Sequence, residues 1–257
     1  MFGENYEGKQ IAIDGKTVRG SVDESKNQSA LHLLNACAVD DGILLAQMKV
    51  DGKTNEITVV PEMLDSLDIK GAMISVDALN TQKNATKIID GKANYTLALK
   101  GNHPSLNEAA EQLFQNNQLE IPKLELVEKE HGRHTTRTYD QINVDKYNLP
   151  QVIDWKGLIA IGRVQTLCLQ SKKQETEVRY YLLSYNDLNL FAKSARNHWG
   201  VESSHWILDV TFSEDRSRVR KDHAPQNFSL IRKFAINILK SFKGKLSISL
   251  TRIKLAL

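Results

Sequence analysis

Short apolar runs of strand length alternate with polar turns through the first fifty residues. Asp40, Asp41 and Gly42 separate the last two of these runs, and an Asp-Gly pair favours a hairpin because both residues tolerate positive φ. The pattern therefore predicts an antiparallel meander of three strands. The three runs are residues 10–14, 32–39 and 43–50.

Helical spacing of apolar residues then alternates with two further strand-like runs. The first helical stretch covers 54–67, and the second surrounds Ala85 and Ile88. Residues 72–76 (AMISV) are apolar throughout, which is typical of a strand buried on both faces, and 95–99 form the next strand. Helical crossovers favour parallel pairing, so the order β-β-β-α-β-α-β predicts an α/β fold with a mixed sheet flanked by helices.

The pattern changes between residues 121 and 185. Short runs rich in Val, Ile, Tyr and Thr, such as TRTYDQINV and VRYYLLS, are separated there by polar turns. Such runs predict a β-rich segment built of hairpins.

Helical spacing returns after this segment, from Leu188 to Trp199 and on to Leu208. The last helix has Pro225 in its first turn and carries an apolar stripe that we expect to be buried. The stripe consists of Phe228, Ile231, Ala235, Ile238 and Leu239.

Composition is that of an ordinary globular protein. The chain has 257 residues, of which 41% are hydrophobic and 25% charged, with a net charge of +3. These values argue against long disorder and coiled coil. No apolar run reaches membrane-spanning length, and the polar N-terminus is no secretory signal. Cys37 and Cys168 stand in apolar surroundings without a CxxC pair, which favours free thiols in a reducing cytosol over a disulfide framework or zinc knuckle.

Two carboxylates stand directly after apolar strands. Asp14 follows the first strand and Asp77 follows the AMISV strand. Carboxylates at strand ends lie at the rim of a sheet, where mixed α/β folds commonly bind ligands. If the two strands are neighbours, these side chains can share a divalent cation, and oxygen ligands suit Mg²⁺ or Mn²⁺ better than zinc.

A third candidate is Glu202, in the segment RNHWGVESSHWILD. On a helix His198, Glu202 and His205 share one face at four- and three-residue spacing. Trp199 and Trp206 flank that face, and we expect them to fix the helix against the sheet. Glu202 would then be placed to act as a metal ligand.

Each of these features also has a plainer interpretation. A strand-end aspartate is commonly a turn or capping residue, and an isolated helical glutamate is commonly solvated. The two histidines could be core residues or zinc ligands, although H-x3-E-x2-H lacks the spacing of a zinc-protease helix. The combination of strand, strand and helix carboxylates is more specific than any one of them.

Basic residues near these carboxylates are candidate phosphate contacts. Arg216, Arg218 and Arg220 alternate, so in an extended segment they project from one face about 6.6 Å apart. The alternative is a solvated charge or a surface ion pair, for example with Glu214 or Asp215. The other candidates are Lys16, Arg19, Lys83, Lys100, His198 and Lys221, with Arg133 and Arg137 in the β-rich segment.

Several stretches of the chain resemble a known family. IAIDGKTVRGS, ISVDALNTQK, NYTLALKGNHPSL, HGRHTTRTY and RNHWGVESSHWILDVTFSEDRSRVRKDHAPQN resemble the bacterial insertion-sequence transposases of the H-repeat-associated branch. That branch belongs to the DDE transposases, which have a ribonuclease-H-like fold. The resemblance runs from about residue 10 to 239. It implies that Asp14 and Asp77 are the catalytic aspartates and Glu202 the catalytic glutamate.

The resemblance also implies an organisation and a chemistry. Residues 1–120 correspond to the first part of the catalytic core, 121–185 to a β-rich insertion, and 186–257 to the C-terminal helical part of the core. The three carboxylates would hold two Mg²⁺ or Mn²⁺ ions and cut and join double-stranded DNA at element ends and target. The active form would be a homodimer in the bacterial cytoplasm, associated with the nucleoid.

The sequence departs from this family in two places. Members of the branch usually have about a hundred residues ahead of the first aspartate, one domain's worth, whereas 13 precede Asp14 here. We therefore expect a core that lacks the end-recognition module, as in a truncated copy. The wider group also has Arg and Lys where His198 and Asp209 stand. A metal-dependent nuclease of the same fold and an inactive DNA-binding relic remain the alternative interpretations.

Overall fold

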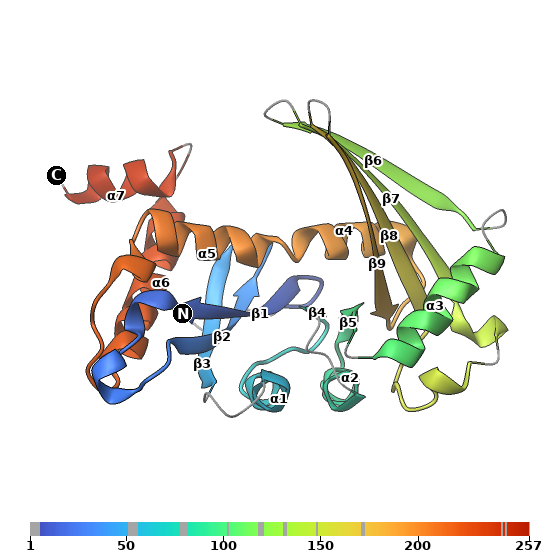
Figure 1. Cartoon of the computed structure of the whole chain (residues 1–257), viewed down its shortest axis with the longest axis horizontal. Helices are drawn as coiled ribbons and strands as arrows, with labels where there is room; N and C mark the ends of the chain where they lie inside the picture. Colours follow the sequence, from blue (N-terminus) through green and yellow to red (C-terminus); the bar gives the residue numbers. More distant parts are fainter. Residues whose placement is uncertain are drawn as a thin grey trace. The chain divides into compact units, whose positions relative to one another are not determined.

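The computed structural model describes residues 6–50, 56–77, 82–101, 103–117, 121–130, 133–147, 149–170, 173–242, 244 and 246–256. The chain divides into two compact units, and each is considered by itself. The first combines residues 1–68 with 197–257, and the second covers 69–196 (Figure 1). The three-segment organisation expected from the sequence stays a prediction.

The first unit is built on an antiparallel meander. Strands β1 (Gln10–Val18), β2 (Leu31–Ala38) and β3 (Ile43–Val50) pair in the order β3-β2-β1, with Asp14 opposite Asn35 and Ala36 opposite Ala46. Gly42 has φ +63 in the turn between β2 and β3, which confirms the predicted hairpin.

Helices and short 3-10 turns complete the first unit. The helices are α1 (Glu56–Asp65), α5 (Gly200–Val210), α6 (Ala224–Phe242) and α7 (Ile248–Ala256), and the 3-10 turns are η1 (Arg19–Ser21), η2 (Glu24–Lys26) and η5 (Glu214–Arg216). Helix α5 lies over the strands (Figure 1), and its Val201 packs in a buried cluster with Ala12, Cys37 and Leu44. Burial of these apolar side chains is what attaches α5 to the meander.

The second unit contains the remaining strands. Its strand order is β4-β5-β9-β8-β7-β6, with β4 and β5 parallel and the other pairs antiparallel. The strands are β4 (Met73–Val76), β5 (Asn94–Leu99), β6 (Lys123–Glu130), β7 (Arg133–Asn143), β8 (Ala160–Gln170) and β9 (Lys173–Leu183). Long strands β6–β9 confirm the β-rich segment ahead of α5, and the parallel pair makes the architecture mixed, as predicted.

The second unit also carries three helices. They are α2 (Gln82–Asp90), α3 (Pro104–Asn116) and α4 (Leu188–Asn197), with 3-10 turns η3 (Val144–Lys146) and η4 (Pro150–Val152). Tyr139, Tyr181 and Phe191 form the aromatic centre of its core. Gly162 on β8 lets the Phe191 ring approach, because a Cβ there would lie 2.6 Å from the ring. Helix α3 was not predicted, although Pro104 at its first turn is a start signal.

The prediction of one continuous helix from Leu188 to Leu208 is wrong in one respect. Helix α4 ends at Asn197 and α5 begins at Gly200, so His198 lies in the break. The expected role of Trp206 is also wrong, because this side chain is 61% exposed. The buried positions of α5 are Val201, Ser204 and Leu208, at three- and four-residue spacing.

The predicted buried stripe of α6 is confirmed at Leu239 but wrong at three of its five positions, and Ala235 is half-buried. Phe228, Ile231 and Ile238 are exposed, and the buried residues are Pro225, Ser229, Lys233, Ile236 and Leu239. The reason lies in β3, the end strand of the sheet order, whose outer backbone groups need polar partners.

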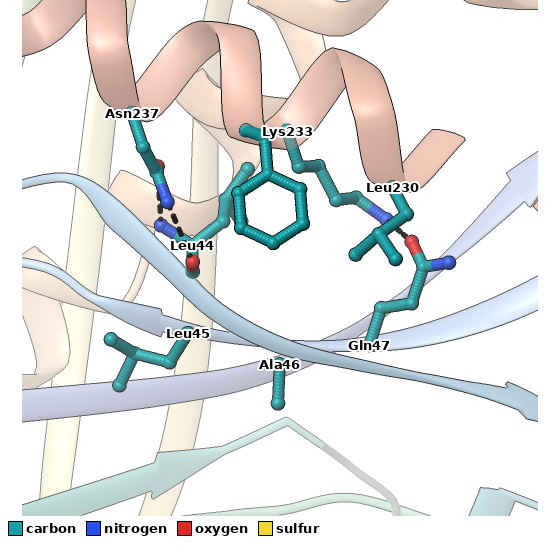
Figure 2. Close-up of a pocket in the computed structure, with 8 residues that line it drawn as sticks. Leu44, Leu45, Ala46, Gln47, Leu230, Lys233 and Asn237 are labelled. Carbon is teal, nitrogen blue, oxygen red and sulfur yellow. Dashed lines mark hydrogen bonds between the residues drawn. The ribbon is translucent and has the colours of Figure 1, made fainter. Parts of the chain in front are cut away.

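Polar side chains of α6 supply those partners, as Figure 2 shows. The Leu44 amide donates to Asn237 Oδ1 at 3.0 Å, and Asn237 Nδ2 donates to the Leu44 carbonyl at 2.9 Å. Lys233 Nζ donates to Gln47 Oε1 at 2.5 Å. The helix therefore turns Lys233 and Asn237 inward beside the apolar Ile236 and Leu239, and most of its predicted stripe outward. A cavity of about 190 Å³ remains beneath Leu230 and Phe234.

The cysteines and the helices can be compared with what the composition predicted. Cys37 and Cys168 are both buried free thiols, as expected. Within the described residues, no helix combines the length and apolar character that a membrane crossing requires.

Candidate active site

Asp14 lies in the middle of β1, with its side chain 25% exposed. The expectation that the first strand ends at Asp14 is therefore wrong, because β1 stays paired with β2 as far as Val18. Before Asp14, the buried residues Ile11, Ala12 and Ile13 anchor the strand in the core. In the antiparallel pairing Asp14 stands opposite Asn35 of β2. The carboxylate is thus attached to a rigid strand and still reachable by solvent, which a ligand for a cation requires.

Glu202 is exposed in the first turn of α5, the helix that packs on β1. Gly200 begins this helix, and a Cβ at that position would lie 2.5 Å from Val39 Cγ1 at the end of β2. The start of α5 can therefore sit against the meander only because residue 200 has no side chain.

His205 joins α5 to β1 next to Asp14. Its Nδ1 lies 3.6 Å from Asp14 Oδ2, and its Nε2 lies 3.5 Å from Asn35 Nδ2. Burial, with the charges of Lys16, Lys233 and His198, lowers the pKa of His205 to about 4. The ring is therefore neutral at neutral pH, and its 3.6 Å contact with Asp14 is not an ion pair.

Lys16, two residues after Asp14, makes a second connection between β1 and α5. Its buried ammonium lies 2.7 Å from Asp209 Oδ1, and 3.4 Å from carboxylate oxygens of both Glu214 and Asp215. Burial by itself lowers the pKa of Lys16, but the hydrogen bond to Asp209 and the charges of all three carboxylates outweigh it and raise that pKa. Lys16 is therefore engaged inside the protein, unlike the phosphate contact expected from the sequence.

Helix α5 is thus held against β1 at two successive turns. His205 meets Asp14, and Asp209, four residues further along the helix, meets Lys16. Glu202 is one turn before His205, so the same docking fixes the helix turn that carries Glu202 beside the strand that carries Asp14. The sequence spacing indicated the helix face but not the Lys16–Asp209 pair.

Asp77 belongs to the second unit, directly after β4. Its side chain is 42% exposed, and Lys100 Nζ lies 2.8 Å from Oδ1 and 2.9 Å from Oδ2. Because β4 and β5 are parallel, with Val76 opposite Leu97, the residues that follow them come to the same edge. The expectation that Lys100 lies near the aspartates is met for Asp77. Residues 78–81 lie outside the described part of the chain, and Lys83 is exposed in the first turn of α2.

Convergence of all three carboxylates stays a prediction. Asp14 and Glu202 belong to one unit and Asp77 to the other. In the part of the chain that the structure describes, no group of three or more His, Cys, Asp or Glu residues lies close enough together to hold a metal ion.

Arg19 and the basic segment after η5 come together in the first unit. The Arg19 amide donates to Asp215 Oδ1 at 3.1 Å, while its side chain is 83% exposed. Gly20 lies directly against the Ser217 carbonyl, where a Cβ would clash with backbone. The turns η1 and η5 are therefore adjacent, and the Gly20 contact was not apparent from sequence.

The remaining basic candidates differ in exposure. Arg216, Arg218 and Lys221 are exposed and Arg220 is half-buried. Arg216 lies in η5, and residues 217–220 form no regular element, so a strictly extended comb of arginines is not present. His198 is half-buried in the turn before α5.

Two arginines of the β-rich segment, Arg137 and Arg163, pair with carboxylates of the protein itself. Arg137 is buried, and its Nη1 lies 2.6 Å from Glu128 Oε2, so the expected DNA contact is not supported. The Arg133 side chain lies outside the described residues. Arg163 makes a buried bidentate pair with Asp140, with N–O distances of 3.0 and 2.5 Å, which sequence reasoning missed.

Comparison with known proteins now identifies the class. Residues 6–238 match the family described as the transposase DDE domain, and the protein belongs to that family. This confirms the resemblance found in the sequence.

Two similar relatives come from Escherichia coli. The chain is 40% identical over 251 residues to "Putative transposase YncI" of strain O157:H7, which covers 93% of this chain and 64% of the relative. It is 40% identical over 243 residues to "H repeat-associated putative transposase YhhI" of strain K12, across 91% of this chain and 64% of the relative. The chain thus spans about 64% of the length of these relatives.

A solved structure agrees on the fold. The chain is similar to piggyBac transposase in a synaptic complex with hairpin DNA, with a TM-score of 0.52 and 13% identity, over 97% of this chain and 52% of the other. This likeness confirms the ribonuclease-H-like α/β fold class.

Proposed function

We propose that the chain is the catalytic core of an insertion-sequence transposase, which cleaves DNA at element ends and joins the freed 3′ hydroxyl to target DNA. The observation that carries this proposal is the docking of α5 on β1. The Lys16–Asp209 ion pair and the packing of Val201 hold α5 on the meander, with the His205 ring beside Asp14, so the Glu202 turn lies next to the Asp14 strand. Family membership supplies the reaction class.

Asp14, Asp77 and Glu202 are assigned as ligands of two divalent cations, Mg²⁺ or Mn²⁺. The donor set fits such cations, because the three side chains offer hard carboxylate oxygens and all are at least partly exposed. When bound, such cations activate the attacking oxygen and neutralise charge on the leaving oxygen.

Neighbouring side chains have separate tasks in this proposal. Neutral His205 fills the space beside Asp14 without placing a competing positive charge there. Lys100 holds Asp77 by an ion pair and would turn to a DNA phosphate when a cation replaces it at the carboxylate. Lys16 positions α5 through Asp209 and does not contact DNA.

Double-stranded DNA is the proposed substrate, bound through exposed cations of the first unit. Arg19 and Arg218 come from adjacent segments and present their guanidinium groups to solvent. Arg216, Arg220 and Lys221 extend this basic surface, and Lys83 and His198 are assigned as weaker contacts. Such groups bind the phosphate backbone with little sequence preference. A homodimer is the proposed active form.

Plasmid nicking with Mg²⁺ or Mn²⁺ tests the assignment. Asp77→Asn should abolish nicking, since it removes a metal ligand, while DNA retention in a filter-binding assay should persist because Lys100 loses its carboxylate partner. The matched control is Asp90→Asn, an exposed aspartate of the same unit that pairs with Lys156. Nicking by Asp77→Asn at the control's rate, or nicking that survives EDTA, would show that these carboxylates are not the active site.

A further inference from the structure

Helix α6 presents an apolar stripe to solvent. Phe228, Ile231, Ile238 and Phe242 are 45%, 59%, 57% and 64% exposed, and Ala235 lies between them. Their spacing of three, four, three and four residues places all five on one side of the 19-residue helix. The inward face of α6 is already used by hydrogen bonds to β3, so this stripe is not needed for the unit's own core.

The fully exposed residues of α6 carry no charge, and Arg232, a cation beside them, is 16% exposed, with its guanidinium 5.9 Å from the Phe228 ring. The exposed residues of the helix are Asn227, Phe228, Leu230, Ile231, Phe234, Ile238, Ser241 and Phe242. A surface for a nucleic-acid backbone would need Lys or Arg at such positions. An uncharged apolar stripe instead fits a partner that presents an uncharged apolar surface, and a second copy of the same stripe meets that condition without like-charge repulsion.

The exposed area is of the size that a dimer requires. The large apolar side chains of α6 expose on the order of 500 Å², which is near the upper end for the largest patch of a typical monomer. Pairing the α6 surfaces of two copies would bury on the order of 1,000 Å² in total, the area from which an interface can be specific.

We propose that α6 pairs with α6 of a second copy, antiparallel about a two-fold axis at Ala235. A two-fold axis at residue 235 places Phe228 of one copy opposite Phe242 of the other, and Ile231 within one residue of Ile238. The small Ala235 lets the helix axes approach at the crossing. The arrangement is isologous and closes on two copies. This arrangement gives an interface for the homodimer of the proposed function, and it rests on that proposal for the choice of a second copy as partner. The exposed stripe itself does not depend on the assignment of the three carboxylates.

Cysteine cross-linking tests the geometry, since the two native cysteines are buried. In Ala235→Cys the new thiol lies at the two-fold axis, next to the same thiol of the second copy. Mild oxidation should therefore give a disulfide-linked dimer. In the antiparallel pair the two copies of residue 228 are roughly 21 Å apart, so Phe228→Cys should stay monomeric on a non-reducing gel. Gln112→Cys, exposed on α3, controls for random collision. Cross-linking of Phe228→Cys as efficient as that of Ala235→Cys would overturn the arrangement.

Sedimentation equilibrium on the whole chain tests the association itself. The wild type should dimerise at micromolar concentration, and Ile231→Asp with Ile238→Asp should weaken dimerisation on the order of 100-fold. Both side chains are exposed, so the urea unfolding midpoint should not fall. A wild-type chain that stays monomeric would overturn the inference, even if a different protein were later found to cover the stripe. A wild-type chain that dimerises but does not nick DNA would count against the proposed active site and not against the dimer.

Discussion

Lys16 and Lys233 are two buried lysines of the same unit whose pKa values shift in opposite directions. Lys16 is surrounded by Asp209, Glu214 and Asp215, and their charges raise its pKa despite burial. For Lys233 burial dominates and lowers the pKa to about 8, with the Glu214 charge opposing and the Lys16 charge adding to the shift. The number of carboxylates within reach, and not burial alone, decides the sign.

Lys233 predicts a pH dependence of stability. Its pKa rises from about 8 in the folded chain to 10.5 in the unfolded chain, so between these values the unfolded chain binds more protons. The contribution of Lys233 to the free energy of unfolding should therefore increase with pH in this range, by at most about 3 kcal/mol. Urea unfolding at pH 8 and pH 10 should show a change in the free energy of unfolding that is more positive in wild type than in Lys233→Met.

The upper limit of pH 10 matters for that measurement. Burial raises the pKa values of Tyr181 and Tyr185 to about 12 and also raises that of the Cys37 thiol. Deprotonation of such groups in the unfolded chain opposes the Lys233 effect from about pH 9 upward, so the difference between the two proteins is the quantity to compare. Lys254→Met, at an exposed position of α7, should keep the wild-type pH dependence. If the free energy of unfolding of Lys233→Met changes between pH 8 and pH 10 by the same amount as that of wild type, the Lys233 assignment is wrong.

At the scale of elements, the position of α5 on the meander should control catalysis. Gly200→Ala would bring a Cβ to 2.5 Å from Val39 Cγ1, and a β-branched side chain has little freedom to move away. The first turn of α5, and Glu202 with it, should shift, and a displacement of this size commonly lowers rates by about 10–100-fold. Nicking rates at saturating DNA measure the effect.

A second substitution separates displacement from simple loss of stability. Val39→Ala removes the methyl group in the way, so the double variant Gly200→Ala with Val39→Ala should regain most of the nicking rate. Gly101→Ala is the control, because a Cβ there meets nothing within 4 Å. If the double variant nicks DNA as slowly as Gly200→Ala, then the close contact between residue 200 and Val39 does not control the position of Glu202.

For the whole molecule, charge placement matters more than total charge. The net charge is only +3, yet Arg19, Arg216 and Arg218 are exposed on neighbouring segments of the first unit. A local group of cations of this kind binds DNA by releasing counterions, even when the protein as a whole is nearly neutral.

DNA binding should therefore weaken steeply with salt. The slope of log K against log salt concentration should become less negative by about 1 in Arg218→Ala, since each phosphate contact contributes about 0.9. Lys254→Ala, an exposed cation on α7, should leave the slope unchanged. Fluorescence anisotropy over a salt series measures both variants, and equal slopes would remove Arg218 from the interface.

Local chemistry made much of the fold predictable from sequence. Apolar runs and an Asp-Gly turn are properties of neighbouring residues, and they located β2, β3 and the hairpin between them. The same holds for β4 and the β-rich strands β6–β9. Asp14 within β1 and Asp77 after β4 were identified because a carboxylate next to an apolar run is visible in the sequence.

Only the tertiary structure decided which way helices face and which charges pair. Helix α6 turns Asn237 and Lys233 inward because the end strand β3 presents unsatisfied backbone and amide groups, a demand that the helix's own sequence does not contain. Lys16 meets Asp209 across 193 positions of sequence, so spacing gave no sign of the pair. The sequence alone determined where strands and carboxylates occur, because these depend on adjacent residues. Folding determined their partners, because an unpaired polar group is satisfied by whatever lies nearest in space.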